Sequence, residues 1–172
     1  MLAFAALAST LALACPQNLA SGIDTPATTT RLVTVEAKVL RTTYAELRTW
    51  KKVRGCWVAA AGPYTARLGE NGLSANNSFQ HVRCGTRPPF GGASEEMWQQ
   101  PKPYSYLAVI EYNLRPVVPG KGSGMFLHAQ TGGPTIGCVS LRKAELRAVL
   151  RWLRPGAAPM IAIGSRAQLR SP

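Results

Sequence analysis

Apolar side chains recur at every second position near the start of the chain, at Val33, Val35, Ala37 and Val39. A period of two is typical of a strand that buries one face and exposes the other. The pattern therefore predicts a half-buried strand over residues 31–39.

Further segments have the composition of strands. Residues 44–50 and 56–62 flank the basic turn 51–55, which predicts a hairpin, and residues 64–69 form another short strand. Residues 105–113 are apolar and long enough to predict a central strand of a sheet.

Residues 142–154 follow a helical pattern and lie between strands predicted at 124–129 and 159–164. Their apolar positions form one stripe with spacings of three and four: Leu146, Val149, Leu150 and Leu153. Many strands with one main helix predict a β-rich α+β domain. We expect a small mixed or antiparallel, β-sandwich-like sheet, with the helix directly after a cysteine motif.

The N-terminus is apolar and uncharged, too short to cross a bilayer as a helix, and ends in an A-x-A cleavage pattern at Ala14. We expect a signal peptide at 1–14, a Pro- and Thr-rich linker at 15–30, the domain at 31–164 and a C-terminal tail at 165–172. The protein is then exported. Cys15, directly after the cleavage pattern, is a candidate lipid attachment site.

The 172 residues include 20 basic and 8 acidic side chains, a formal net charge of +12, and the mean hydropathy is −0.03. This charge favours polyanionic partners, which include nucleic acid, anionic lipid and acidic wall polymers. The basic residues are scattered, without an Arg-rich block or interleaved aromatic residues. Non-specific anion contact is therefore favoured over a base-reading surface, and we expect no nucleic-acid partner.

Export changes the interpretation of the cysteines, because disulfides form in oxidising compartments. Cys56 and Cys84 are candidates for a bridge, which leaves Cys138 unpaired. His81, Cys84 and Cys56 are three potential zinc ligands, but they have neither a fourth member nor paired spacing, so no metal is expected.

Cys138 lies ten residues after His128 and just before the predicted helix. Alternation along residues 124–129 lets His128 project from a rigid strand, and Ser140 is placed to cap the helix. A helix N-terminus and a nearby imidazolium both lower the pKa of a thiol from about 8.5. The spacing therefore predicts a cysteine nucleophile with a histidine base.

The run "FLHAQTGGPTIGCVSL" contains a short His…[Ser/Thr]-x-Gly-Cys-[Val/Ile] motif. Together with "FQHVRCGTRPPFGG" and "AVIEYNLRPVVPG" it resembles the L,D-transpeptidase catalytic domain of the YkuD type, in its compact exported actinobacterial-like branch. The likeness covers most of residues 31–164. It implies a cysteine acyltransferase that cuts peptidoglycan stem peptides before a terminal D-alanine and passes the acyl group to an amine, or to water as a carboxypeptidase.

The resemblance also implies roles for single residues. Cys138 matches the family nucleophile, His128 its base, and the carbonyl of Ala129 the group that orients the imidazole. The amides of Gly137 and Cys138 are candidates for an oxyanion hole. No cofactor is implied, and we expect a monomer that is peripheral to the membrane or wall.

The chain departs from the family pattern at several positions. Ile136 stands where the family usually has His, Thr135 where it has Ser, and Ser140 where it has Arg or Asn. A contact to the substrate carboxylate is therefore expected to move to Arg142 or Arg115.

An apparent internal deletion also separates the chain from this branch, which carries a longer stretch between the counterparts of Ser74 and Phe79. It leaves two alternatives to the enzyme open. One is an inactive or truncated transpeptidase-like domain that binds the wall. The other is a basic nucleic-acid-binding protein, which requires that residues 1–14 are not a leader.

Overall fold

A computed structural model describes residues 14–73, 97–114, 116–122 and 124–170. Several features predicted above lie outside the described residues: the signal peptide apart from Ala14, the deletion between Ser74 and Phe79, His81, Cys84 and Arg115.

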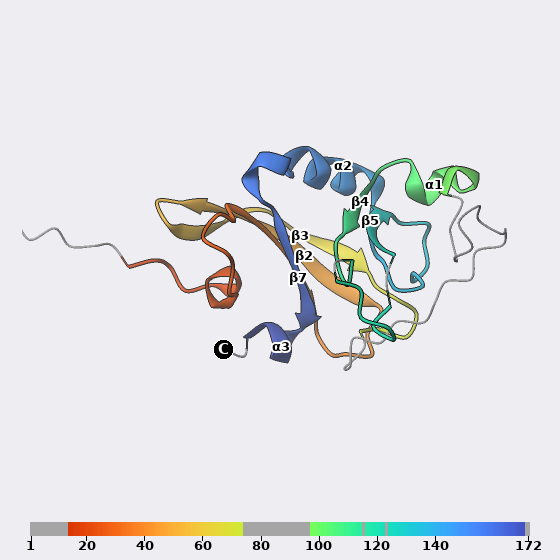
Figure 1. Cartoon of the computed structure of the whole chain (residues 1–172), viewed down its shortest axis with the longest axis horizontal. Coiled ribbons are helices and arrows are strands. Elements are labelled where there is room, and N and C mark those ends of the chain that lie inside the picture. The colour runs from red at the N-terminus through yellow and green to blue at the C-terminus, as the bar shows by residue number, and fades with distance from the viewer. Residues whose placement is uncertain (1–13, 74–96, 115, 123, 171–172) are drawn as a thin grey trace, which may run out of the picture.

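The described residues form one mixed sheet of seven strands in the order β4-β5-β6-β3-β2-β1-β7 (Figure 1). The strands are β1 (Arg31–Ala37), β2 (Tyr44–Val53), β3 (Cys56–Arg67), β4 (Leu107–Ile110), β5 (Met125–Ala129), β6 (Val139–Leu141) and β7 (Met160–Ser165). The helices are α1 (Pro101–Tyr104), α2 (Lys143–Trp152) and α3 (Arg166–Arg170), with 3-10 turns η1 (Leu19–Gly22), η2 (Met97–Gln99) and η3 (Pro155–Ala157). The expected strand-rich α+β class with one main helix is confirmed.

The sheet is antiparallel at most of its pairings and parallel at two. β1, β2, β3 and β6 pair antiparallel in succession, as do β4 and β5. The pairs β5–β6 and β1–β7 are parallel. The predicted hairpin is present, but the run 64–69 is not a separate strand, because β3 continues without a break to Arg67.

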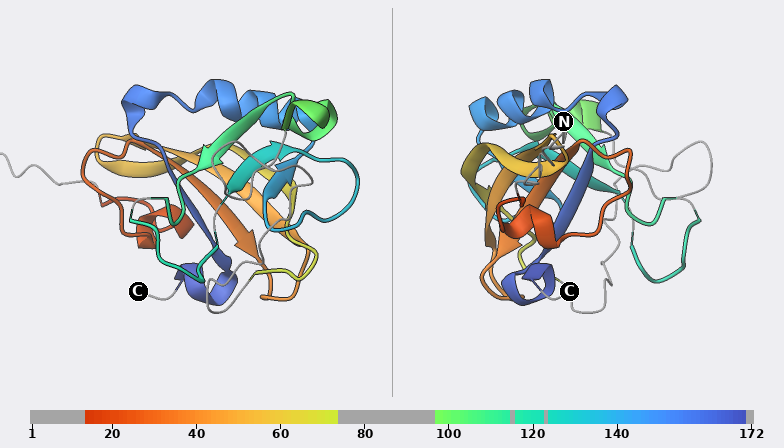
Figure 2. Two further views of the ribbon diagram at one scale, coloured as in Figure 1. Left: turned by 45° about the vertical axis from the view of Figure 1, so that its right-hand side comes forward. Right: turned by 90° about the vertical axis from the view of Figure 1, so that its left-hand side faces the viewer.

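The main helix covers one face of the sheet. α2 packs over β4, β5 and β6 (Figures 1 and 2). Its predicted stripe faces the core: Leu146 and Val149 are buried, and Leu150 and Leu153 pack at the margin. On the sheet the same core takes alternate residues such as Leu127 from β5, so the neighbours of these residues point to the opposite face.

The strand expected at 105–113 differs from its prediction. β4 spans only Leu107–Ile110 and lies at one edge of the described sheet rather than at its centre. Tyr112 and Asn113 already belong to a turn. The segment is apolar because Ala108 and Ile110 pack against the core from one face of β4.

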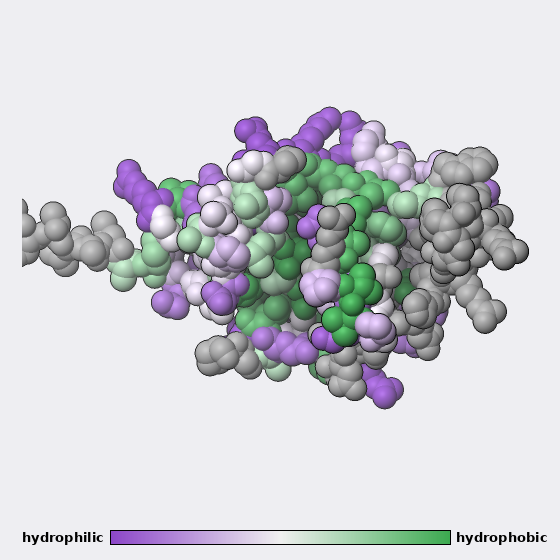
Figure 3. Space-filling model, in the orientation of Figure 1, coloured by the Kyte–Doolittle hydropathy of each residue, from purple (hydrophilic) through white to green (hydrophobic). Residues whose placement is uncertain are grey.

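The loop that follows β4 is held together by one side chain. The Asn113 side-chain amide donates to the carbonyls of Val118 and Gly122 at 3.0 and 2.7 Å, and its oxygen accepts from the Val118 amide at 2.7 Å. Leu114 and Val117 are exposed on this loop. Figure 3 shows apolar surface across the middle of the face that carries it.

The segment expected to be a linker packs against the sheet instead. Ala20 is fully buried in a small apolar cluster with Leu32, Trp50 and Trp57. The Asn18 side chain donates a hydrogen bond of 2.9 Å to the carbonyl of Trp57. Residues 14–30 are therefore part of the folded unit, because their few apolar side chains cover the two tryptophans.

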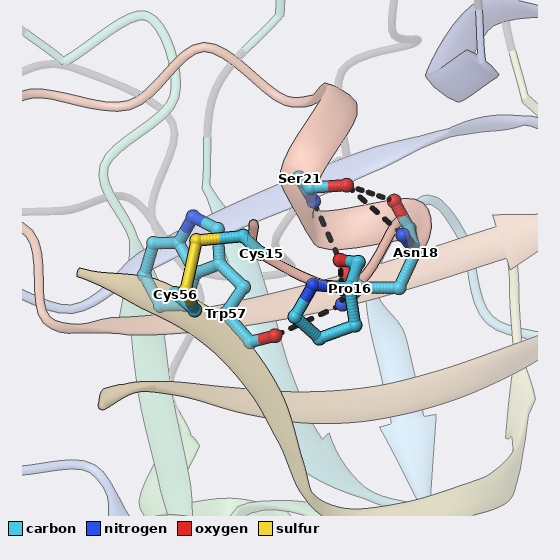
Figure 4. Close-up of a disulfide and its surroundings, with 6 residues drawn as sticks. All are labelled: Cys15, Pro16, Asn18, Ser21, Cys56 and Trp57. Carbon is cyan, nitrogen blue, oxygen red and sulfur yellow. Dashed lines mark hydrogen bonds between the residues drawn. A yellow bond between two sulfur atoms is a disulfide. The ribbon is translucent and has the colours of Figure 1, made fainter. Parts of the chain in front are cut away.

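The expected pairing of Cys56 with Cys84 is wrong. Cys56 forms a disulfide with Cys15, with the two Cα atoms 5.2 Å apart (Figure 4). The N-terminal segment folds back over the start of β3 and brings the two sulfurs together. A sulfur in a disulfide is not available for a lipid thioether, so lipidation at Cys15 is excluded in this structure.

The C-terminal segment is also structured. α3 is tied to β1 because Arg166 and Arg170 both approach the carboxylate of Glu36, at 2.7 and 3.4 Å. Glu36 is buried and its partners neutralise its charge. Among the described residues, no helix has the length and apolarity to cross a bilayer.

We predict that Cys15→Ser lowers the free energy of unfolding by about 2–4 kcal/mol, because the bridge closes a loop with a sequence separation of 41 residues. Denaturant titration under oxidising conditions measures the change. Cys56→Ser and the double variant should match the single variant, and reductant should affect only the wild type. Recovery of a Cys56–Cys84 peptide from non-reduced digests would contradict the assignment.

Candidate active site

The parallel pairing of β5 with β6 brings the two predicted catalytic residues to one place. His128 on β5 is the register partner of Ser140 on β6. Cys138 lies directly before β6, two positions ahead of Ser140. Cys138 and His128 both line one cavity of about 540 Å³.

The wall of this cavity comes from three segments. They are the loop 130–138 with Ser140 of β6, β5 with the glycine before it, and η2 with α1. The lining residues are Gln99, Gln100, Pro101, Lys102, Pro103, Tyr104, Gly124, Met125, His128, Thr131, Gly133, Pro134, Thr135, Ile136, Gly137, Cys138 and Ser140. This described lining contains no carboxylate and includes the exposed cation Lys102, so it is suited to an anionic or neutral ligand.

His128 is held in one orientation. Its side chain is buried, and Nδ1 lies 2.9 Å from the carbonyl oxygen of Ala129, the group that the family resemblance implies. A carbonyl can only accept, so Nδ1 carries the proton and Nε2 is the basic nitrogen of the neutral ring. The ring of Tyr104 packs edge-on at 5.3 Å between centroids and fixes the imidazole plane.

Cys138 is not part of a disulfide, and it is partly accessible from the cavity. Its Sγ lies 3.9 Å from the carbonyl oxygen of Gly124, at the start of the strand that carries His128. The thiol is therefore located between the two strand ends rather than in the apolar core, where a structural cysteine is often found.

Thr135 organises the loop that leads into Cys138. Its hydroxyl donates to the Cys138 carbonyl at 2.6 Å and accepts from the Gly137 amide at 3.2 Å. Its backbone amide donates to the carbonyl of Leu68 at 2.8 Å, and its carbonyl accepts from the amide of Glu70 at 2.8 Å. These bonds attach the loop to the end of β3.

The main contribution of Gly137 to the site is its backbone conformation rather than a hydrogen bond to a substrate. Its φ of 138° lies in a region that favours glycine, and a Cβ on Gly69 would lie only 3.3 Å from its backbone. Its amide already donates to Thr135. Of the two amides expected to form an oxyanion hole, that of Cys138 is the remaining candidate.

Ser140 is not the helix cap that the sequence predicts. The N-cap position of α2 is Arg142, with no side-chain cap bond, and Ser140 lies within β6. Its side chain is fully buried, and its Oγ has no hydrogen-bond partner among the described residues. A buried polar atom without a partner costs about 1–3 kcal/mol, so its presence calls for an explanation.

Of the two arginines expected near the substrate, Arg142 does not line this cavity. The Arg142 guanidinium pairs with Glu145, and this hydrogen bond, followed by the charge of Glu145, raises the pKa of Arg142 above its ordinary value. Arg115 lies outside the described residues. Sequence reasoning missed Lys102 and Tyr104, which line the cavity but belong to no element predicted from the sequence.

No family model, curated protein or solved structure matches this chain. Within the described ranges, no three His, Cys, Asp or Glu side chains are grouped so that they could hold a metal ion. The chemistry of the site is therefore inferred from its own geometry.

We predict that Thr135→Val lowers the free energy of unfolding by about 1–2 kcal/mol, because two hydrogen bonds in the loop are lost at nearly constant volume. The same change should slow alkylation of Cys138 by iodoacetamide, since the carbonyl of Cys138 loses its anchor. Thr135→Ser keeps the hydroxyl and is the matched control. Equal alkylation rates in the two variants would show that Thr135 does not position the thiol.

Proposed function

We propose that the protein is an exported cysteine acyltransferase of the L,D-transpeptidase type, acting on peptidoglycan stem peptides. The observation that carries the proposal is the placement of His128 and Cys138 on one cavity, with the imidazole oriented by the Ala129 carbonyl. A nucleophile, a base and a group that orients the base are the parts that acyl transfer requires.

The reaction begins with proton transfer from the Cys138 thiol to Nε2 of His128. The thiolate attacks the carbonyl carbon before the terminal D-alanine, and the tetrahedral intermediate collapses when the imidazolium donates its proton to the leaving amine. D-alanine leaves and a thioester remains on Cys138. A side-chain amine of a second stem peptide then attacks the thioester, loses a proton to His128 and releases the sulfur. Water in place of the amine gives carboxypeptidation.

Two properties support the proposed location of the protein outside the cytoplasm. A disulfide between Cys15 and Cys56 suits an oxidising compartment, which supports export. The net charge of +12 favours accumulation near an acidic wall polymer. We infer a monomer peripheral to the wall or membrane, with stem peptides as its partners and no nucleic acid.

One observation favours a second candidate, an inactive wall-binding domain. The Gly137 amide is engaged by Thr135, so one of two expected oxyanion donors is not directed at a substrate. Loss of such a donor costs acyl transfer about 100- to 1,000-fold in known cases. The acylation experiment below separates the candidates.

We predict that incubation with a carbapenem, an inhibitor class associated with the family, adds one inhibitor mass to the wild type and none to Cys138→Ala. The reason is that only a live nucleophile opens the lactam ring. Mass spectrometry of intact protein and of its peptides locates the adduct. Cys84→Ala, which removes another thiol, should still be acylated; an unmodified wild type would favour the inactive domain.

We also predict that iodoacetamide alkylates Cys138 with a pH midpoint below the ordinary thiol value of about 8.5. The attacking form is the thiolate, so a nearby imidazolium extends reactivity to lower pH. His128→Gln should move the midpoint upward and slow the reaction at neutral pH. A midpoint that is the same in both proteins would rule out coupling between the two side chains.

A further inference from the structure

We propose that Arg67 and Ser140 form a carboxylate-binding subsite beside Cys138, which recognises the free C-terminal carboxylate of the donor peptide. The identity of that peptide rests on the proposed function. The preference for an anionic group near the Cys138 thiol does not depend on the proposed function, because it can be measured without acyl transfer.

Strand register places the two residues in one row with the histidine. Arg67 at the end of β3 pairs with Ser140 on β6, and Ser140 pairs with His128 on β5. Directly paired residues point to the same face of a sheet. The strand neighbours of Arg67, Ala66 and Leu68, belong to the core beneath α2, so the row points to the opposite face.

Both residues present a donor without an acceptor. Oγ of Ser140 and Nε of Arg67 are buried and have no hydrogen-bond partner in the described part of the chain. Neighbouring unsatisfied donors are unfavourable in the empty protein, and an acceptor from a ligand relieves both. The geometry therefore points to an oxygen ligand.

The guanidinium of Arg67 is oriented by an aromatic ring and has no ion pair among the described residues. Its Cζ lies 3.8 Å from the ring centroid of Tyr44, its register partner on β2. The nearby Glu46 is paired with Arg48 at 3.2 Å. A planar cation with spare N–H groups next to a hydroxyl matches a carboxylate better than a neutral group.

The row continues into the reaction cavity. Ser140 lines the same cavity as His128 and Cys138. Neighbouring strands are about 4.8 Å apart, so the arginine is one strand from the serine and two from the imidazole. The carboxylate of a donor peptide is on the residue directly after the scissile bond. When the Cys138 thiol contacts the carbonyl carbon of that bond, the carboxylate is within reach of the row formed by Arg67, Ser140 and His128.

Two other cations serve as comparators. Arg142 is exposed and paired with Glu145, whereas no ion pair to Arg67 is present among the described residues. Lys102 is exposed and lines the cavity from α1. The proposal assigns anion recognition to Arg67 rather than to either of them.

The test compares alkylation of Cys138 by iodoacetate and by iodoacetamide, followed at the Cys138 peptide by mass spectrometry. In both reactions the thiolate displaces iodide, so any change in thiol ionisation cancels in the ratio of the two rates. We expect Arg67→Gln to lower the iodoacetate-to-iodoacetamide ratio by about three- to tenfold, since one close cation is removed. Ser140→Ala should lower it by about two- to threefold.

The controls distinguish this subsite from general charge. Arg142→Gln removes the same charge and should leave the ratio within about twofold, as expected for an exposed, screened charge. Ser140→Ala should leave the melting temperature unchanged or raise it, because it removes a buried hydroxyl without a partner. Arg67→Lys keeps the positive charge, so its ratio should fall less than that of Arg67→Gln. Where Arg67→Gln does not fold, the ratio of Ser140→Ala tests the site.

Either of two results would overturn the proposal: an unchanged ratio in Ser140→Ala and, where it folds, in Arg67→Gln, or a ratio that falls only in Lys102→Gln. With a stem-peptide donor, Arg67→Gln should raise KM for the free acid and leave KM for the C-terminal amide unchanged. Failure of the wild type to acylate would reject the proposed function, while the alkylation ratio would still decide the subsite.

Discussion

The parallel pairing of β5 with β6 is the constraint on which the site depends. Parallel neighbours are normally joined by a crossover of about a dozen residues or more, usually including a helix. Here residues 130–138 make the connection as a loop, and the geometry is possible because Thr135 hydrogen-bonds to the end of β3 on the way. The same short crossover that closes the sheet delivers Cys138 next to the strand of His128.

The sheet also separates packing from chemistry. Leu127, Val139 and Leu141 point toward α2 and form the core, while the intervening His128 and Ser140 point away from it. Strand alternation thus allows adjacent residues to serve stability and reactivity. The cost is a row of polar side chains on the second face, of which Ser140 has no partner among the described residues. Functional sites are where such local inconsistencies are expected.

Periodicity predicted the local elements well because each depends on neighbouring residues. The hairpin of β2 and β3 and the apolar stripe of α2 are read directly from spacing, and the structure has them. β1 is a strand as its alternation predicts, but the expectation that it is half-buried is wrong, because it lies between β2 and β7 and is buried at every position from Leu32 to Ala37. The position of a strand within the sheet depends on long-range pairing. Local composition predicted β4 at the centre of the sheet, but it lies at an edge. The partner of Cys56 and the place of Arg67 depend on how distant segments fold together, which no local pattern contains.

β3 links the two ends of the molecule. It begins at Cys56, in the disulfide, and ends at Arg67, beside Ser140. A strand of 12 residues spans roughly 30–40 Å, so the bridge and the reactive thiol are held far apart. Thiol–disulfide exchange requires direct attack of one sulfur on another. A rigid strand between them therefore keeps the disulfide between Cys15 and Cys56 out of reach of the Cys138 thiol.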